Sequence, residues 1–199
     1  MTDLLVLHTL RCLGFTDLER VAAAAGLTTS DAESRLIDLA VDGLVTRTPG
    51  AFGGWGLTES GKIADARLVA AELAAAGARD AVGAAFEAFL VLNPELLDLC
   101  TAWHMRPVDG ISEVNDHSDA AYDGRVLARF VDLDQRAAAV CTALTAALPR
   151  FGGYRGRLTA ALDLARAGKL EHLADTTTSY HNVWFQLHED LLVTLGIPR

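Results

Sequence analysis

Residues 27–62 read LTTSDAESRLIDLAVDGLVTRTPGAFGGWGLTESGK, and this stretch decides how the first part of the chain folds. The run Thr28–Asp31 offers helix caps, because short side chains with an oxygen atom accept hydrogen bonds from the free amides of a first helical turn. Apolar residues then recur at helical spacing up to Gly43, which predicts a helix with one buried face. Two short runs, 44–47 and 55–58, flank a glycine-rich tip and predict a two-stranded ribbon. A new helix should open at Thr58.

The residues before this stretch predict two more helices. Residues 3–13 fit the first helix, and Thr16 or Asp17 caps a second one that Gly26 closes. The turn at 26–29 is then the turn of a helix-turn-helix motif.

This order of elements, with the "DGLV" turn and the "GWGLTESGK" exit, resembles the winged helix of bacterial transcription regulators, most closely the multiple-antibiotic-resistance-repressor (MarR) type. The resemblance covers about the first third of the chain. It implies that the helix after Thr28 enters the major groove of DNA and that the ribbon forms a wing. By position, the residues facing DNA would be Thr28, Thr29, Ser30, Glu33, Ser34 and Arg35, with Arg47 near the base of the wing and the uncharged tip 51–54.

The charge of this segment opposes a DNA-binding role. Residues 1–66 carry five basic and nine acidic side chains, which gives a net charge of −4 in a chain of net charge −9. A DNA-binding face is normally a basic stripe, because neutralising phosphates supplies most of the non-specific affinity. Arg35 is the one strong base or phosphate reader that the helix after Thr28 offers, and Asp31 and Glu33 would repel phosphates.

Composition indicates a folded, helix-rich protein. The chain has 199 residues, is 51% hydrophobic and has only five prolines. Cys12, Cys100 and Cys141 are widely spaced and odd in number, so neither a disulfide framework nor a paired metal motif is expected. No apolar run is long enough to cross a membrane, and the acidic start gives no secretory signal, so we expect a cytoplasmic location.

The rest of the chain predicts a helical domain. We expect the winged helix to occupy 1–66 and an α-helical ligand-binding or dimerisation domain to occupy 67–199, in a mainly α protein. The predicted helices span 58–77, 78–92, 94–105, 120–148, 158–167 and about 177–195. Asn93 and Pro94 should break the second of these, 106–118 should be a loop, and 150–157 (RFGGYRGR) should be a Gly-rich basic connection, solvated or able to bind an anion.

Histidine and aromatic residues gather in two segments of this second domain. In the last helix, His181, Trp184 and His188 share a face at helical spacing, which suits either a core or a ligand pocket. A second cluster precedes and follows the 106–118 segment. The predicted small-molecule site consists of Trp103, His104, Asn115, His117, Tyr122, Tyr180, His181, Trp184 and His188.

A metal site is not expected from these residues. His181 and His188 are two helical turns apart, too far to chelate one ion as an HExxH helix does. His104, Asp116 and His117 could still meet a histidine of the last helix in space. The chain also lacks a GxSxG elbow, a Walker loop and a dinucleotide fingerprint, so no cofactor is expected.

Three functions therefore remain open. The first is a homodimeric, ligand-responsive transcription regulator that binds DNA. The second is a small enzyme or accessory protein whose acidic winged helix no longer binds DNA; its acid–base residues would be His181, His188, Glu189, His117 and Asp116. The third is a protein-interaction module. The strings NDHSDAAYD and SYHNVWFQLHEDLL are also similar to actinobacterial winged-helix proteins labelled as regulators, whose relatives are associated with phosphoenolpyruvate-utilising dikinase-like proteins; this resemblance implies no catalytic residue.

Overall fold

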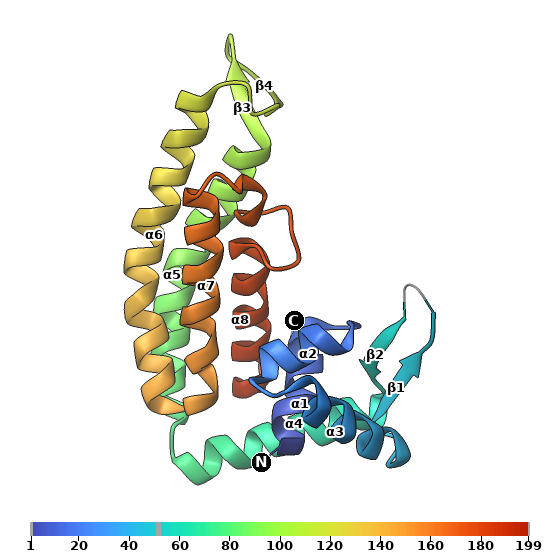
Figure 1. Cartoon of the computed structure of the whole chain (residues 1–199). Coiled ribbons are helices and arrows are strands. Elements are labelled where there is room, and N and C mark those ends of the chain that lie inside the picture. Colours follow the sequence, from blue (N-terminus) through green and yellow to red (C-terminus); the bar gives the residue numbers. More distant parts are fainter. Residues whose placement is uncertain (1, 51–52, 199) are drawn as a thin grey trace. The chain divides into compact units, whose positions relative to one another are not determined.

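The computed structural model describes residues 2–50 and 53–198, and the predicted wing-tip residues 51 and 52 lie outside that range (Figure 1). The chain is mainly helical, as expected, with two small two-stranded antiparallel sheets. It forms two compact units. The first comprises the chain up to Arg79 together with the chain from Gln186 onward, and the second comprises Asp80–Phe185. The boundary expected at residue 66 falls inside the helix Glu59–Ala76, and the division of the compact units follows shortly after that helix ends.

Three helices open the first unit: α1 (Thr2–Leu13), α2 (Leu18–Ala25) and α3 (Thr29–Val41). Their predicted caps are confirmed. The Asp17 carboxylate accepts from the Arg20 amide, and the Thr28 hydroxyl oxygen accepts from the Asp31 amide. Gly26 takes the left-handed conformation, with a φ of 67°, that ends α2.

The strands β1 (Val45–Thr48) and β2 (Gly54–Leu57) pair in antiparallel register, with Val45 opposite Leu57 and Thr48 opposite Gly54. Trp55 also forms a bridge with Thr16, which ties the strand to the turn between α1 and α2. The predicted ribbon is therefore confirmed to within one residue at each end.

The exit from β2 into α4 (Glu59–Ala76) is a tight junction. The Thr58 hydroxyl accepts from the Gly61 amide and donates to the Gly43 carbonyl, which joins the start of α4 to the end of α3. A Cβ atom on Gly61 would lie 1.9 Å from the Leu44 carbonyl oxygen, so only glycine fits there. A buried apolar cluster holds these elements together: Val6, Leu7, Leu10, Val21, Leu36, Leu39, Val45 and Trp55.

The predicted break at Asn93 and Pro94 is wrong. A single helix, α5 (Arg79–His104), runs through Pro94. Pro94 lacks an amide hydrogen and leaves one carbonyl without its helical partner. Residues on both sides of Pro94 are buried, among them Phe89 and Leu96, and their packing in the core stabilises a continuous helix. The Asn93 side chain accepts a hydrogen bond from the Trp184 indole instead of capping a new helix.

The predicted loop at 106–118 is also wrong in part. The strands β3 (Met105–Val108) and β4 (Ile111–Val114) form an antiparallel hairpin. Asp109 and Gly110 have φ values of 49° and 82°, the left-handed pair that a two-residue hairpin turn requires. The Asp-Gly dipeptide was the signal for this hairpin.

The second unit continues with α6 (Ala120–Ala147), the 3₁₀ turn η1 (Pro149–Phe151), α7 (Gly152–Arg166) and the 3₁₀ turn η2 (Leu170–His172). The predicted basic connection at 150–157 is wrong, because α7 begins at Gly152. Arg155 lies inside α7 and donates from both terminal nitrogens to Asp134 of α6, at 2.6 and 2.7 Å. This bidentate pair holds the two helices side by side (Figure 1).

The last helix, α8 (Tyr180–Leu195), begins in the second unit and ends in the first, with the division between Phe185 and Gln186. Ser179 precedes it, and the Ser179 hydroxyl accepts from the Asn182 amide. None of the helices within residues 2–50 and 53–198 is long and apolar enough to cross a membrane.

Candidate functional site

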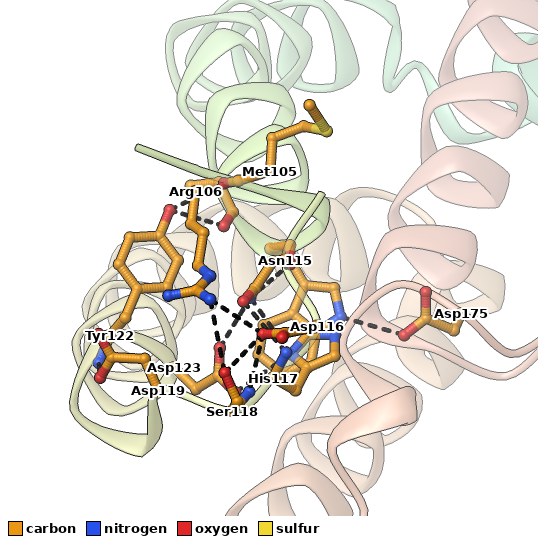
Figure 2. Close-up of polar contacts among 12 residues, drawn as sticks. Met105, Arg106, Asn115, Asp116, His117, Ser118, Asp119, Tyr122, Asp123 and Asp175 are labelled. Carbon is orange, nitrogen blue, oxygen red and sulfur yellow. Dashed lines mark hydrogen bonds and ion pairs between the residues drawn. The ribbon is translucent and has the colours of Figure 1, made fainter. Parts of the chain in front are cut away.

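Polar side chains gather in the second unit, where the β3–β4 hairpin joins α5 and α6 (Figure 2). We call this group the hairpin cluster and define it as Trp103, His104, Asn115, His117, Asp123 and Asp175. Four of the residues predicted to bind a ligand, Trp103, His104, Asn115 and His117, are therefore brought together. Asp123, which follows the second polar segment in the sequence, and Asp175 orient the others, and Asp175 was not predicted.

Asn115 is the buried centre of the cluster. Its amide NH₂ donates to the Trp103 carbonyl at 3.0 Å and to Asp123 Oδ1 at 2.8 Å, which uses both hydrogens. Its side-chain oxygen accepts from the His117 amide at 3.2 Å. His117 has a φ of 58°, a conformation that costs a non-glycine residue energy and that this set of hydrogen bonds supports.

One ring nitrogen of His117 contacts Asp123, and one face of the ring lies against Trp103. Nδ1 lies 3.1 Å from Asp123 Oδ2, and the ring centroid lies 4.3 Å from that of Trp103. When Nδ1 donates its proton to Asp123, the neutral ring carries its lone pair on Nε2. The side chain is 37% exposed. An imidazole oriented in this way can act as a hydrogen-bond acceptor for a ligand or as a general base.

His104 and Trp103 both bind Asp175. His104 Nε2 lies 2.8 Å from Asp175 Oδ1, while the Trp103 indole donates to Oδ2 at 3.0 Å. His104 Nδ1 also lies 2.8 Å from the Cys100 carbonyl. Burial lowers the pKa of the neighbouring His181, and the nearby His104 lowers it further.

Other predicted ligand residues have structural partners. The Tyr122 hydroxyl donates to the carbonyls of Ala102 and Met105, which fixes the hairpin to α6 (Figure 2). Tyr180 and Trp184 are buried in the core: the Trp184 ring stacks on Phe89 at 4.5 Å, and the Tyr180 hydroxyl donates to Asp134. These two aromatics are therefore part of the buried core of the second unit.

The residues named for acid–base chemistry fall into different units. His117, Asp116 and His181 belong to the second unit, while His188 and Glu189 belong to the first. Asp116 is exposed and accepts from Ser118 and Arg106; the Ser118 hydrogen bonds lower its pKa most. It is therefore an anionic turn residue.

The predicted DNA-facing residues lie on an exposed but acidic surface. Thr28, Thr29, Ser30 and Ser34 are exposed at the start of α3. Ser34 and Arg35 line a shallow hollow of about 620 Å³. Arg35 forms ion pairs with Asp3 of α1 and Asp38 of α3. In β1, the Arg47 guanidinium lies 5.5 Å from the centre of the Trp55 ring.

A buried polar group in the first unit was missed by sequence reasoning. His8 of α1 lies between Asp65 of α4 and Asp190 of α8, and Cys12 lies beside it. Burial lowers the pKa of His8, but Cys12, Asp190 and Asp65 together raise it well above its ordinary value. His8 and Cys12 stand four residues apart on one helix face, and that spacing was the available signal.

Comparison of the chain with protein-family models, curated proteins and solved structures gives no match.

Proposed function

We propose that the chain is a winged-helix transcription regulator that binds DNA as a homodimer. The observation that supports this most is the order of elements in the first unit, where α2, a capped turn and α3 are followed directly by the antiparallel β1–β2 ribbon. A helix-turn-helix of this kind presents the start of its second helix to the major groove. Here that start carries three exposed hydroxyl side chains, Thr29, Ser30 and Ser34, which can bind phosphates or base edges.

The positive charge for DNA contact is small in this proposal. Arg35 and Arg47 are the guanidinium groups on α3 and the ribbon, so a dimer brings about four such contacts. Each neutralised phosphate contributes about −0.9 to the slope of log K against log salt concentration, so the expected slope is about −3.6. Binding should therefore be detectable at low salt and weak above it.

The test is fluorescence anisotropy with a labelled DNA fragment from upstream of the protein's own gene, titrated at several salt concentrations. Arg47→Ala should reduce the slope by about two per dimer and weaken binding, because each copy loses one phosphate contact. Arg129→Ala removes the same charge from an exposed position in the second unit and should change neither. No binding by the wild type at low salt, or equal loss in both variants, would overturn the proposal.

We also propose that the hairpin cluster binds the small molecule that controls this regulator. The support is the half-exposed His117 ring, whose orientation Asp123 and Trp103 fix. His117→Gln should abolish the ligand-induced thermal shift in a metabolite screen, while His172→Gln should retain it. The alternative, an enzyme using His117 as a base, predicts that mass spectrometry recovers the ligand chemically changed, whereas a regulator returns it intact.

A further inference from the structure

Four polar side chains lie buried together in the first unit. His8 and Cys12 come from one face of α1, Asp65 from α4 and Asp190 from the part of α8 that begins at Gln186. All four residues are at least nine-tenths buried. His8 Nδ1 lies 3.1 Å from Asp65 Oδ1, and Nε2 lies 3.0 Å from Asp190 Oδ1 and 3.6 Å from Cys12 Sγ. A histidine, a thiol and a carboxylate thus converge on one point, because the imidazole Nε2, Cys12 Sγ and an Asp190 oxygen all lie within 4.8 Å of one another.

The spacing of these atoms suits a tetrahedral metal ion. Zinc binds nitrogen and oxygen at about 2.0–2.2 Å and sulfur at about 2.3 Å, so its ligand atoms stand about 3.3 Å (N to O) and 3.6 Å (N to S) apart. The corresponding distances from His8 Nε2 are 3.0 Å to Asp190 and 3.6 Å to Cys12. These two distances therefore fit a tetrahedral site, and the third, between Cys12 Sγ and an Asp190 oxygen, is within 4.8 Å.

The surrounding hydrogen bonds also have the pattern of a metal site. A metal-binding histidine donates its other ring nitrogen to a carboxylate or carbonyl, which directs the remaining lone pair at the ion. Asp65 stands in that place opposite His8 Nδ1. Asp190 has a second-sphere partner of its own, because the Thr194 hydroxyl donates to its Oδ1 at 3.0 Å.

We propose that His8, Cys12 and Asp190 bind a zinc ion, with Asp65 as the positioning residue that orients His8. A thiolate, an imidazole and a carboxylate are the ligand types that zinc accepts together, whereas magnesium and calcium select oxygen atoms alone. The fourth coordination position falls to a water molecule or to the second oxygen of Asp190. This proposal is independent of DNA binding, because the four residues are buried and none of them belongs to α3 or to the β1–β2 ribbon.

The experiment uses full-length protein without an affinity tag, stripped with chelator, kept reduced and titrated with Co²⁺. One equivalent should produce a thiolate-to-cobalt charge-transfer band and tetrahedral d–d bands, and Zn²⁺ should then displace both. Cys12→Ser should remove the charge-transfer band. Asp65→Asn should keep the band but weaken cobalt binding about 10- to 100-fold, because His8 loses its orienting partner.

Cys141→Ser is the matched control. Cys141 is also a buried cysteine outside any disulfide, and burial raises its pKa to about 11, so it stays a thiol. This variant should bind Co²⁺ like the wild type. The proposal is overturned if wild-type protein gives no charge-transfer band, or if the band survives Cys12→Ser. The titration of the wild-type protein tests metal binding without any variant, so the proposal can be overturned even if a variant misfolds.

Discussion

Replacing Asp3 with asparagine should strengthen DNA binding, because Asp3 competes with phosphate for Arg35. In the first unit the Arg35 guanidinium is paired with Asp3 and Asp38. The two side chains of the Asp3 pair are 29% and 45% exposed, and exposed ion pairs of this kind contribute about 0.2–1 kcal/mol. Freeing Arg35 should therefore tighten binding about 1.4- to 5-fold per copy, or about 2- to 30-fold for two copies.

The assay is the anisotropy titration at a fixed low salt concentration, with Asp109→Asn as the matched control. Asp109→Asn also removes one negative charge, but in the second unit, and asparagine tolerates the left-handed backbone of this position well. Asp3 lies in the first turn of α1, where its negative charge favours the helix terminus, so circular dichroism should be used to check that Asp3→Asn retains the helical content.

Two results would refute this reasoning. If Asp3→Asn and Asp109→Asn change affinity equally, the gain is a general effect of net charge and not the release of Arg35. If Arg35→Ala binds as tightly as the wild type, Arg35 does not contact DNA and α3 is not the reading helix.

Three further predictions concern stability. Gly61→Ala should destabilise the first unit by about 2–3 kcal/mol in urea unfolding, because its Cβ would lie 1.9 Å from the Leu44 carbonyl oxygen; Gly124→Ala, which meets no atom within 4 Å, should be neutral or stabilising. Thr58→Ala should cost about 1–2 kcal/mol by removing the cap of α4, and Thr58→Ser should restore most of it. The pKa of His181 is lowered in the folded protein, so the stability that the neutral ring contributes is present above pH 6.5 and is lost as the pH falls through the lowered pKa. The wild type should therefore lose more free energy of unfolding between pH 7.5 and 5.5 than His181→Gln does. Equal losses in the two proteins would contradict this.

Local signals in the sequence predicted the first unit well, because each element there carries its own start and stop. Asp17, Thr28 and Thr58 cap three helices, and Gly26 and Gly77 end two of them as expected. These contacts join residues close together in the chain, so the pattern alone contains them.

The errors in the second unit arise where tertiary packing overrides a local signal. Pro94 favours a break, yet burial on both sides of it sustains one helix. Gly152 and Gly153 favour a loop, yet α7 begins at Gly152, and its Arg155 forms an ion pair with Asp134 of α6 that stabilises the helix there. Such partners lie far apart in the chain, and no local pattern reveals them.

The same limit applied to the candidate sites. The hairpin cluster was partly predicted, because its histidines and Trp103 stand out by residue type, but Asp175 lies 71 residues from His104. The His8 group was missed because Asp65 and Asp190 look like ordinary surface acids in the sequence. Only the fold shows that both are buried against one imidazole.

The return of the chain to the first unit at Gln186 has a consequence for synthesis on the ribosome. The second unit is one continuous segment and can fold as soon as it emerges, whereas His8 waits for Asp190. At about 5–20 residues per second, roughly 6–25 seconds separate the synthesis of Asp65 from that of Asp190. During this interval His8 and Cys12 of the nascent first unit lack their carboxylate partner Asp190. A chaperone or a protease that acts in this interval therefore binds an incompletely folded first unit.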